Sequence, residues 1–187
     1  QEKLPIWIAV GGTPTSAARA GMLGLPMAVA IIGGTTPPFV PLIDYYREAA
    51  RVSGHDPAAM PVSINAHGYI AEDAQEAFED GFRYAEPVMR RIAQERRFSP
   101  PTRERAMIES ILKGANFSGS PEQAIEKILY QYELFHHQRF LLQISVGTMP
   151  HAKVMRAIEL FGTIVAPAVR AEIARREAPS AAASSEQ

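Results

Sequence analysis

The chain has no cysteine among its 187 residues, which excludes disulfide bonds, a thiolate nucleophile and zinc–thiolate sites. Its formal net charge is only −1, so there is no electrostatic basis for binding nucleic acid or an anionic membrane. It also lacks an apolar run of the roughly 20 residues that a membrane-spanning helix requires. The first residues do not resemble a secretory signal. From these absences we expect a cytoplasmic protein with no nucleic-acid or membrane partner.

The hydrophobic fraction of 47% is high enough to build one sizeable core, and no linker separates two domains. Apolar runs bounded by glycine and proline alternate with stretches of helical periodicity, which predicts a parallel sheet covered by helices. Each predicted strand is apolar over most of its length, as strands buried on both faces are. We predict strands at 6–10, 27–32, 62–71 and 139–146, and helices at 14–23, 38–52, 72–97, 103–113, 121–135 and 150–176.

Two architectures satisfy this alternation. One is a small doubly wound sheet, and the other is half of an eight-stranded barrel, whose complete form has roughly 250 residues. A half barrel exposes two unpaired strand edges, so it requires a partner. The Ala/Ser-rich residues 178–187 have no apolar period and are predicted to form a disordered tail.

Local signals predict where several helices begin and end. Ser120 and Gln123 have the spacing of a capping box, with a proline at the first helical position between them. Gly54 is placed to end the helix at 38–52, and a Pro-Pro pair at 100–101 to end the helix at 72–97. In the helix at 103–113, four apolar residues at helical spacing are predicted to face the core, namely Met107, Ile108, Ile111 and Leu112.

The first predicted strand runs into a glycine-rich turn and then a helix. Thr13 is a good N-cap, whose hydroxyl can accept from a main-chain N–H of the first turn, and Pro14 suits the first helical position. Gly11 and Gly12 let the backbone turn tightly and approach a ligand closely. A strand, such a turn and a helix N-terminus together favour phosphate binding. The same residues also suit an ordinary strand–helix turn without a ligand.

The five histidines offer few sites for metal or acid–base chemistry. His67, late in the third predicted strand, and His151, after the fourth, lie toward the strand ends where a ligand binds. Each either contacts a ligand or serves only the structure. His136 and His137 are adjacent at a helix end, where a cation suits the helix dipole, and we expect no metal site. His55 lies in a turn and is predicted to face solvent.

Three blocks of the sequence resemble the luciferase-like flavin-dependent monooxygenases, the family of bacterial luciferase and alkanesulfonate monooxygenase. They are Ile8–Gly34, Gly119–Ile128 and Arg139–Arg170. Their order and the long insertion between them make the resemblance specific, and it extends from about Leu4 to Arg175.

The resemblance implies that residues 1–177 are the C-terminal half of one (β/α)8 TIM-barrel domain. They would be its last four βα units, with a helical insertion at about 72–119 before the last strand. It implies a monooxygenase that uses reduced FMN from a separate flavin reductase, and O₂, on a small organic substrate. One alternative is a non-catalytic chain, either a truncated flavoprotein or a half-barrel module that self-associates. A second alternative is a deazaflavin-dependent hydride-transfer enzyme. The missing N-terminal half or a second copy would cover the strand edges, and we expect a homo-oligomer.

The resemblance also assigns cofactor-binding positions. The turn after the first strand corresponds to the family's phosphate-binding turn, and the next strand to positions near the isoalloxazine ring. These residues are Gly11, Gly12, Thr13, Ser16, Ala28 and Ile31. No catalytic residue is assigned beyond the candidates His67 and His151.

In this family the insertion often forms a mobile lid over the active site. Arginines there would bind an anionic substrate group, or would face solvent between glutamates. The arginines in question are Arg83, Arg90, Arg91, Arg96 and Arg97.

Overall fold

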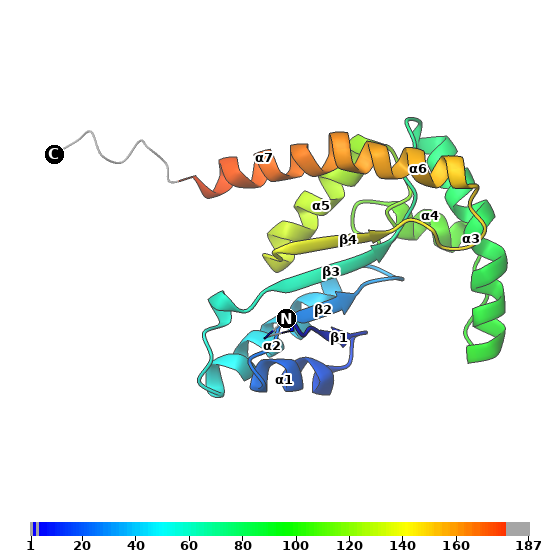
Figure 1. Cartoon of the computed structure of the whole chain (residues 1–187). Coiled ribbons are helices and arrows are strands. Elements are labelled where there is room, and N and C mark those ends of the chain that lie inside the picture. Colours follow the sequence, from blue (N-terminus) through cyan, green and yellow to red (C-terminus); the bar gives the residue numbers. More distant parts are fainter. Residues whose placement is uncertain (1, 3, 179–187) are drawn as a thin grey trace.

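The computed structural model describes residue 2 and residues 4–178. Its centre is one sheet of four parallel strands in the order β1-β2-β3-β4 (Figure 1). The strands are β1 (Ile8–Val10), β2 (Met27–Ala30), β3 (Val62–His67) and β4 (Arg139–Gln143). The predicted parallel α/β sheet is confirmed, and each strand is shorter than the apolar run that predicts it.

Helices connect the strands and extend the chain beyond β4. They are α1 (Pro14–Met22), α2 (Val40–Val52), α3 (Ala74–Arg96), α4 (Arg103–Ser110), α5 (Pro121–Phe135), α6 (His151–Leu160) and α7 (Ala166–Glu177), with short 3₁₀ turns at Pro37–Phe39 and Pro57–Ala59. The single last helix that the pattern predicts is divided by a π-helical turn at Phe161–Val165. This turn lies just before Pro167, which has no N–H to continue the α-helical bonds. The predicted tail at 178–187 lies outside the described residues from 179 onward.

One face of the sheet carries the core. In register across it, Val10, Val29 and Ile64 are each at most 2% exposed, and they pack with residues of α1 and α2. The next strand positions on this face pack against α5 and the α6–α7 segment. All of these helices therefore cover the same face, whereas a doubly wound sheet has helices on both. Among the described residues, the doubly wound alternative does not hold.

The opposite face of the sheet is open. Most of its positions carry small or polar side chains. Ala28, Ala30 and Asn65 are half-buried and Leu141 is 39% exposed, whereas Ser63 is buried. The prediction that the strands are buried on both faces is therefore wrong. The apolar composition of the strands suggested burial on both faces, but alanine occurs on an open face as well as in a core.

A connecting segment, residues 113–119, seals the gap between the ends of β2 and β3. On one side Ala115 N donates to Gly34 O at 3.0 Å. On the other, Phe117 N donates to His67 O at 2.9 Å. Gly68 allows this approach, because a Cβ there would lie 2.5 Å from the main chain of Phe117. The segment therefore forms a floor at the carboxyl end of the sheet.

The long insertion places α3 across that same end of the sheet (Figure 1). Asp73 caps α3, accepting from Glu76 N at 2.8 Å. Lys153 of α6 forms ion pairs with two residues of α3, with its Nζ 2.8 Å from Glu76 Oε1 and 2.6 Å from Asp80 Oδ2. α3 ends at Arg96, before the Pro-Pro pair, because Arg97 adopts a left-handed conformation with φ 58°.

Helix α4 corrects one prediction. Met107, Ile108, Ile111 and Leu112 are 55, 59, 56 and 37% exposed, so they do not form helix core. α4 packs on α3 rather than on the sheet, and Arg103 at its start is ion-paired with Glu79 of α3. The predicted capping box at Ser120 and the stop at Gly54 (φ 82°) are both confirmed. Within the described residues, no helix has the length and apolar character to cross a membrane.

Candidate functional site

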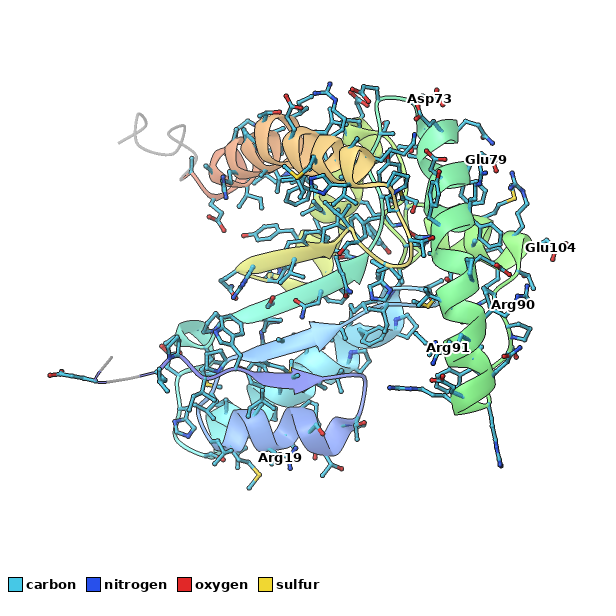
Figure 2. All side chains as sticks on the ribbon, turned by 45° about the vertical axis from the view of Figure 1, so that its right-hand side comes forward. Arg19, Asp73, Glu79, Arg90, Arg91 and Glu104 are labelled. Atoms are coloured by element: carbon cyan, nitrogen blue, oxygen red, sulfur yellow. The ribbon has the colours of Figure 1, made fainter. Side chains whose placement is uncertain are left out.

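A cavity of about 720 Å³ lies at the carboxyl ends of β2, β3 and β4. The strand arrows point toward α3, which stands across this end with Asp73, Glu79, Arg90 and Arg91 along it (Figure 2). The cavity is the space between the strand ends, the 113–119 floor and the helices α3 and α4. Its volume is that of a site for a drug-sized ligand, and carboxyl strand ends are where parallel α/β folds bind ligands.

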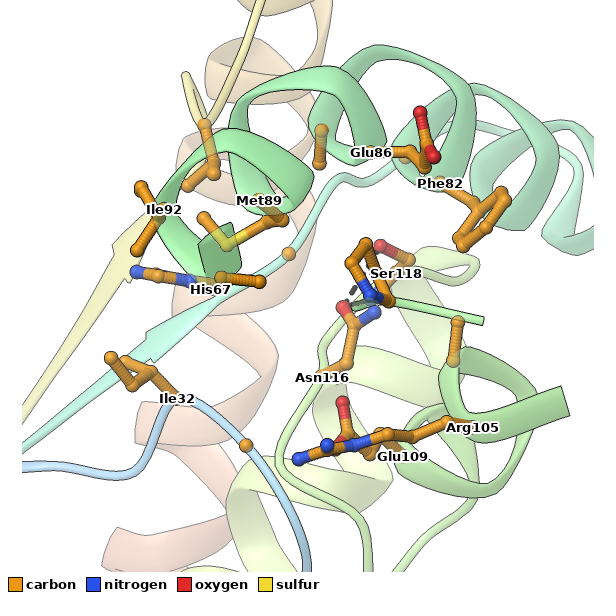
Figure 3. A pocket seen from close by; sticks show the side chains of 18 of the residues that line it. Ile32, His67, Phe82, Glu86, Met89, Ile92, Arg105, Glu109, Asn116 and Ser118 are labelled. Atoms are coloured by element: carbon orange, nitrogen blue, oxygen red, sulfur yellow. Dashed lines mark hydrogen bonds and ion pairs between the residues drawn. The ribbon is translucent and has the colours of Figure 1, made fainter. Parts of the chain in front are cut away.

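The walls of the cavity are mainly apolar. α3 contributes Phe82, Met89 and Ile92, and the segment after β4 contributes Ile144 and Val146. In the close-up, Met89 and Ile92 lie beside His67, and the polar residues gather on the opposite side (Figure 3). Such a lining excludes water from an apolar ligand and leaves a few polar groups to orient it.

His67, one of the two predicted catalytic candidates, lines this cavity at the end of β3. Its side chain is half-buried, and burial lowers the pKa of His67, partly offset by a hydrogen bond with the Gln143 side chain. The imidazole is therefore neutral at pH 7, with one nitrogen to donate and one to accept. His151, the other candidate, is exposed at the start of α6 and is not part of the cavity lining.

Asn116 is the central polar residue of the floor. It is half-buried between buried neighbours and lines the cavity. Its side-chain oxygen accepts from Ser118 N at 3.0 Å and from Ser118 Oγ at 2.9 Å. Sequence reasoning missed this pair, because a polar Asn-Phe-Ser stretch between helices is typical of any loop.

Lys127 of α5 supports the floor from behind. It is 3% exposed, and its Nζ donates to Glu109 O at 3.2 Å and to Asn116 O. Burial lowers the pKa of Lys127 to about 7. The burial of Lys127 could have been predicted from the sequence, because Lys127 lies between Ala124 and Ile128 on the apolar stripe of α5.

Glu109 ties the insertion to the loop after β2. Its Oε1 accepts from Gly34 N at 2.9 Å and from Arg105 Nε at 2.8 Å. Arg105 lines the cavity, so its charge is neutralised where it faces the ligand space. Of the insertion arginines on α3, Arg90 is ion-paired with Glu86 and Arg91 with Glu95. Arg83, Arg96 and Arg97 form no ion pair among the described residues, and Arg96 lines the cavity.

The predicted phosphate-binding turn lies apart from this cavity, after β1. Gly11, Gly12, Thr13 and Ser16 are brought together at the start of α1, but none lines the large cavity. Thr13 is the N-cap as predicted, yet its side chain makes no capping bond, which corrects that expectation. Thr13 is exposed, and its hydroxyl does not accept a hydrogen bond from any main-chain N–H of the first turn.

The turn fits an anionic group on the chemistry of its donors. A Cβ at Gly11 would meet no atom within 4 Å, and Gly12 has φ 106°, which glycine adopts readily. No acidic residue lies in the first turn of α1. Within the described part of the chain, the N–H groups of Gly12, Thr13 and Thr15 bond no acceptor. Free N–H groups at a helix N-terminus are what a phosphate requires.

The two residues predicted to lie near the ring are separated. Ala28 is half-buried on the open face of the sheet, whereas Ile31 is fully buried in the core under α1 and α2. Both contacts stay predictions, and Ile31 would reach a ligand only after repacking.

Two further histidines, His55 and His137, make contacts within the fold. His55 does more than face solvent, since its Nε2 lies 3.1 Å from Met22 O. His137 is 5% exposed, and burial lowers the pKa of His137 to about 4. Over the described residues, no group of three potential His, Asp or Glu ligands is arranged to hold a metal ion.

Comparison with known proteins was made at the level of family and of structure. The model of a family described as luciferase-like monooxygenase matches residues 1–138. The monooxygenase RslO1 from Streptomyces bottropensis is 25% identical and superposes with a TM-score of 0.68, over 87% of this chain and 47% of its own.

Two further structures share the fold. The oxygenating constituent of 3,6-diketocamphane monooxygenase from Pseudomonas putida, in complex with FMN, is 19% identical with a TM-score of 0.60, over 87% of this chain and 48% of its own. An F420-dependent secondary alcohol dehydrogenase with an F420–acetone adduct is 20% identical with a TM-score of 0.61, over 90% and 49%. The chain spans about half the length of these three structures and of the curated relative it matches.

Proposed function

The chain belongs to the luciferase-like monooxygenase family, and from this membership we propose that the complete protein uses reduced FMN and O₂ to oxygenate a small organic substrate. The observation that carries the proposal is the pairing of two sites on one end of the sheet. One is a donor-rich turn before α1 that suits a phosphate, and the other is a largely apolar cavity beyond β2, β3 and β4.

The phosphate of FMN would bind at the start of α1. The main-chain N–H groups of Gly12, Thr13 and Thr15 and the hydroxyls of Thr13 and Ser16 are the donors. The helix dipole and the absence of carboxylates in the first turn favour a dianion there.

The chemistry divides between cofactor and chain. Reduced flavin supplies the electrons that activate O₂. Phe82, Met89 and Ile92 cover the strand ends and keep water away from the reacting groups. His67 shares one ring nitrogen with Gln143 and leaves the other for a ligand within this apolar setting.

The proposal also includes the architecture of the complete protein. We take the four strands as half of an eight-stranded barrel, with the open face of Ala28, Ala30, Asn65 and Leu141 turned toward its interior. Helices on one face only, and the parallel edges of β1 and β4, support this. An N-terminal half or a second copy of the chain would complete it.

A deazaflavin-dependent hydride transfer is the second candidate, favoured by the likeness to an F420-dependent dehydrogenase. Both cofactors carry a phosphate on a ribityl chain, so the α1 turn serves either. A non-catalytic module that self-associates through its open face is the third.

Titration of the full chain with FMN, riboflavin and F420, followed by flavin fluorescence, tests the proposal. We expect FMN to bind at least about tenfold more tightly than riboflavin, because charge-assisted hydrogen bonds to the phosphate are strong. Tighter binding of F420 than FMN would favour the deazaflavin enzyme. Failure to bind any of the three would favour the non-catalytic module.

A further inference from the structure

We propose that Asn116 orients the substrate, by donating a hydrogen bond from its side-chain amide to a carbonyl oxygen of a largely apolar ring compound bound in the cavity. The inference rests on the proposed function only in taking this ligand as the substrate. It assigns the recognition step to a residue of the 113–119 floor.

The orientation of the Asn116 amide follows from its partners. Ser118 N is a main-chain donor and cannot accept, so the Asn116 atom 3.0 Å from it is the carbonyl oxygen. The Ser118 hydroxyl donates to the same oxygen at 2.9 Å. The amino group, Nδ2, is therefore turned the other way. Across the described residues, nothing accepts a hydrogen bond from it.

The main chain of Asn116 is held as firmly as its side chain. Asn116 N donates to Glu109 O at 2.9 Å, and its carbonyl accepts from the buried Nζ of Lys127. A donor fixed in this way loses little conformational entropy when a ligand binds.

The surroundings define the chemical class of the ligand. Across the cavity from Asn116 lie Met89, Ile92 and His67 (Figure 3), and Phe82 adds an aromatic wall. Arg105 is neutralised by Glu109 at 2.8 Å, so this pair does not call for an anion. Arg96, which is exposed, also lines the cavity and has no ion pair among the described residues. Beside it, the fixed Asn116 N–H donor in a mainly apolar space of about 720 Å³ fits a ring compound with a carbonyl group.

The Ser118 hydroxyl cannot replace Asn116 as the donor, because its proton is committed to Asn116 Oδ1. Gly81 of α3 maintains this arrangement. A Cβ at Gly81 would lie 2.5 Å from Ser118 Oγ, so the absence of a side chain lets α3 close over the pair.

A matched pair of probes tests the inference without flavin. 1-Tetralone has a carbonyl group that tetralin lacks, and both have the same ring skeleton. Dissociation constants would be measured for the full chain by ¹H–¹⁵N correlation spectra. We expect 1-tetralone to bind about fivefold more tightly than tetralin, as one neutral hydrogen bond implies. The side-chain NH₂ signals of Asn116 should shift with 1-tetralone and not with tetralin.

Asn116→Asp is the decisive variant. It keeps an oxygen for Ser118 and replaces the free NH₂ with an acceptor, so the fivefold preference should disappear while tetralin binding is unchanged. Asn116→Ala should also abolish the preference, and unchanged melting temperatures would show that both variants fold.

Three results would overturn the inference. They are a preference that persists in Asn116→Asp, no preference in the wild-type chain, and no binding of either probe. FMN binding is measured separately. A chain that binds FMN but shows no Asn116-dependent preference would refute this inference alone, and the reverse result would refute the flavin proposal alone.

Discussion

Lys127 of α5 donates from its buried ammonium group to the main-chain carbonyl of Asn116 in the floor of the cavity. The same Nζ donates to Glu109 O at 3.2 Å, so one side chain joins the end of α4 to the floor. The floor of the cavity is therefore supported by a buried lysine that does not line the cavity.

Replacing Lys127 should change how stability depends on pH. Burial lowers the pKa of Lys127 to about 7, below the value of about 10.4 expected in the unfolded chain. Between these values the unfolded state binds more protons, so stability rises with pH, by up to about 1.4 kcal/mol per pH unit. In Lys127→Met this contribution should be absent. Urea unfolding at pH 7.5, 8.5 and 9.5 measures it, and equal slopes in the two proteins would contradict the assignment.

Buried His137 gives a second pH dependence, at the acid end. Its pKa is lowered to about 4 by burial, against about 6.5 when unfolded. The unfolded state binds more protons between these values, so stability falls as pH drops from 6.5 to 4, by about 3 kcal/mol in total. His137→Phe keeps a ring beside Tyr132 and Phe140 and should remove this part of the acid sensitivity. An unchanged difference in unfolding free energy between pH 7 and pH 4.5 would refute the prediction.

Gly81 and Ser118 should behave as a coupled pair. Alanine at a helical glycine ordinarily stabilises by about 1 kcal/mol. Gly81→Ala should instead destabilise by about 1–3 kcal/mol, because the new Cβ meets Ser118 Oγ and breaks its bond to Asn116. In a Ser118→Gly background the same substitution should stabilise. A double-mutant cycle in urea measures the coupling, and additive effects would show that the contact is not strained.

The open sheet face should mediate association. Leu141 is 39% exposed on it, and we expect the chain to exceed 20.5 kDa in light scattering at micromolar concentration. Leu141→Lys should shift the population toward the monomer. Ile158→Lys is the matched control, because Ile158 is 49% exposed on α6 and lies away from this face. A wild-type monomer, or equal effects of the two variants, would argue against an interface here.

The sequence predicted the order of elements well because its signals are local. The capping box at Ser120 and the stop at Gly54 need only neighbouring residues, and both are confirmed. Helix α4 was predicted as core because Met107 and Ile108 have helical spacing. Spacing does not state what the helix packs on, and α4 packs on α3.

The site was predictable only in part, for the same reason. His67 follows from its place at a strand end. The Asn116–Ser118 pair could not be predicted from the sequence. Its position in the cavity depends on Lys127 of α5 and Gly81 of α3, which only the fold brings next to it. For Thr13, the predicted N-cap position is confirmed, but the predicted hydrogen bond from the first turn to its hydroxyl is absent.

The most direct test of the central claim is FMN affinity in two variants of Gly11. This position leaves open space for a side chain, so Gly11→Gln and Gly11→Glu differ chiefly in charge. If the start of α1 binds the flavin phosphate, Gly11→Glu should weaken FMN binding at least about tenfold relative to Gly11→Gln, with riboflavin affected equally by both. Equal FMN affinities in the two variants would contradict the account.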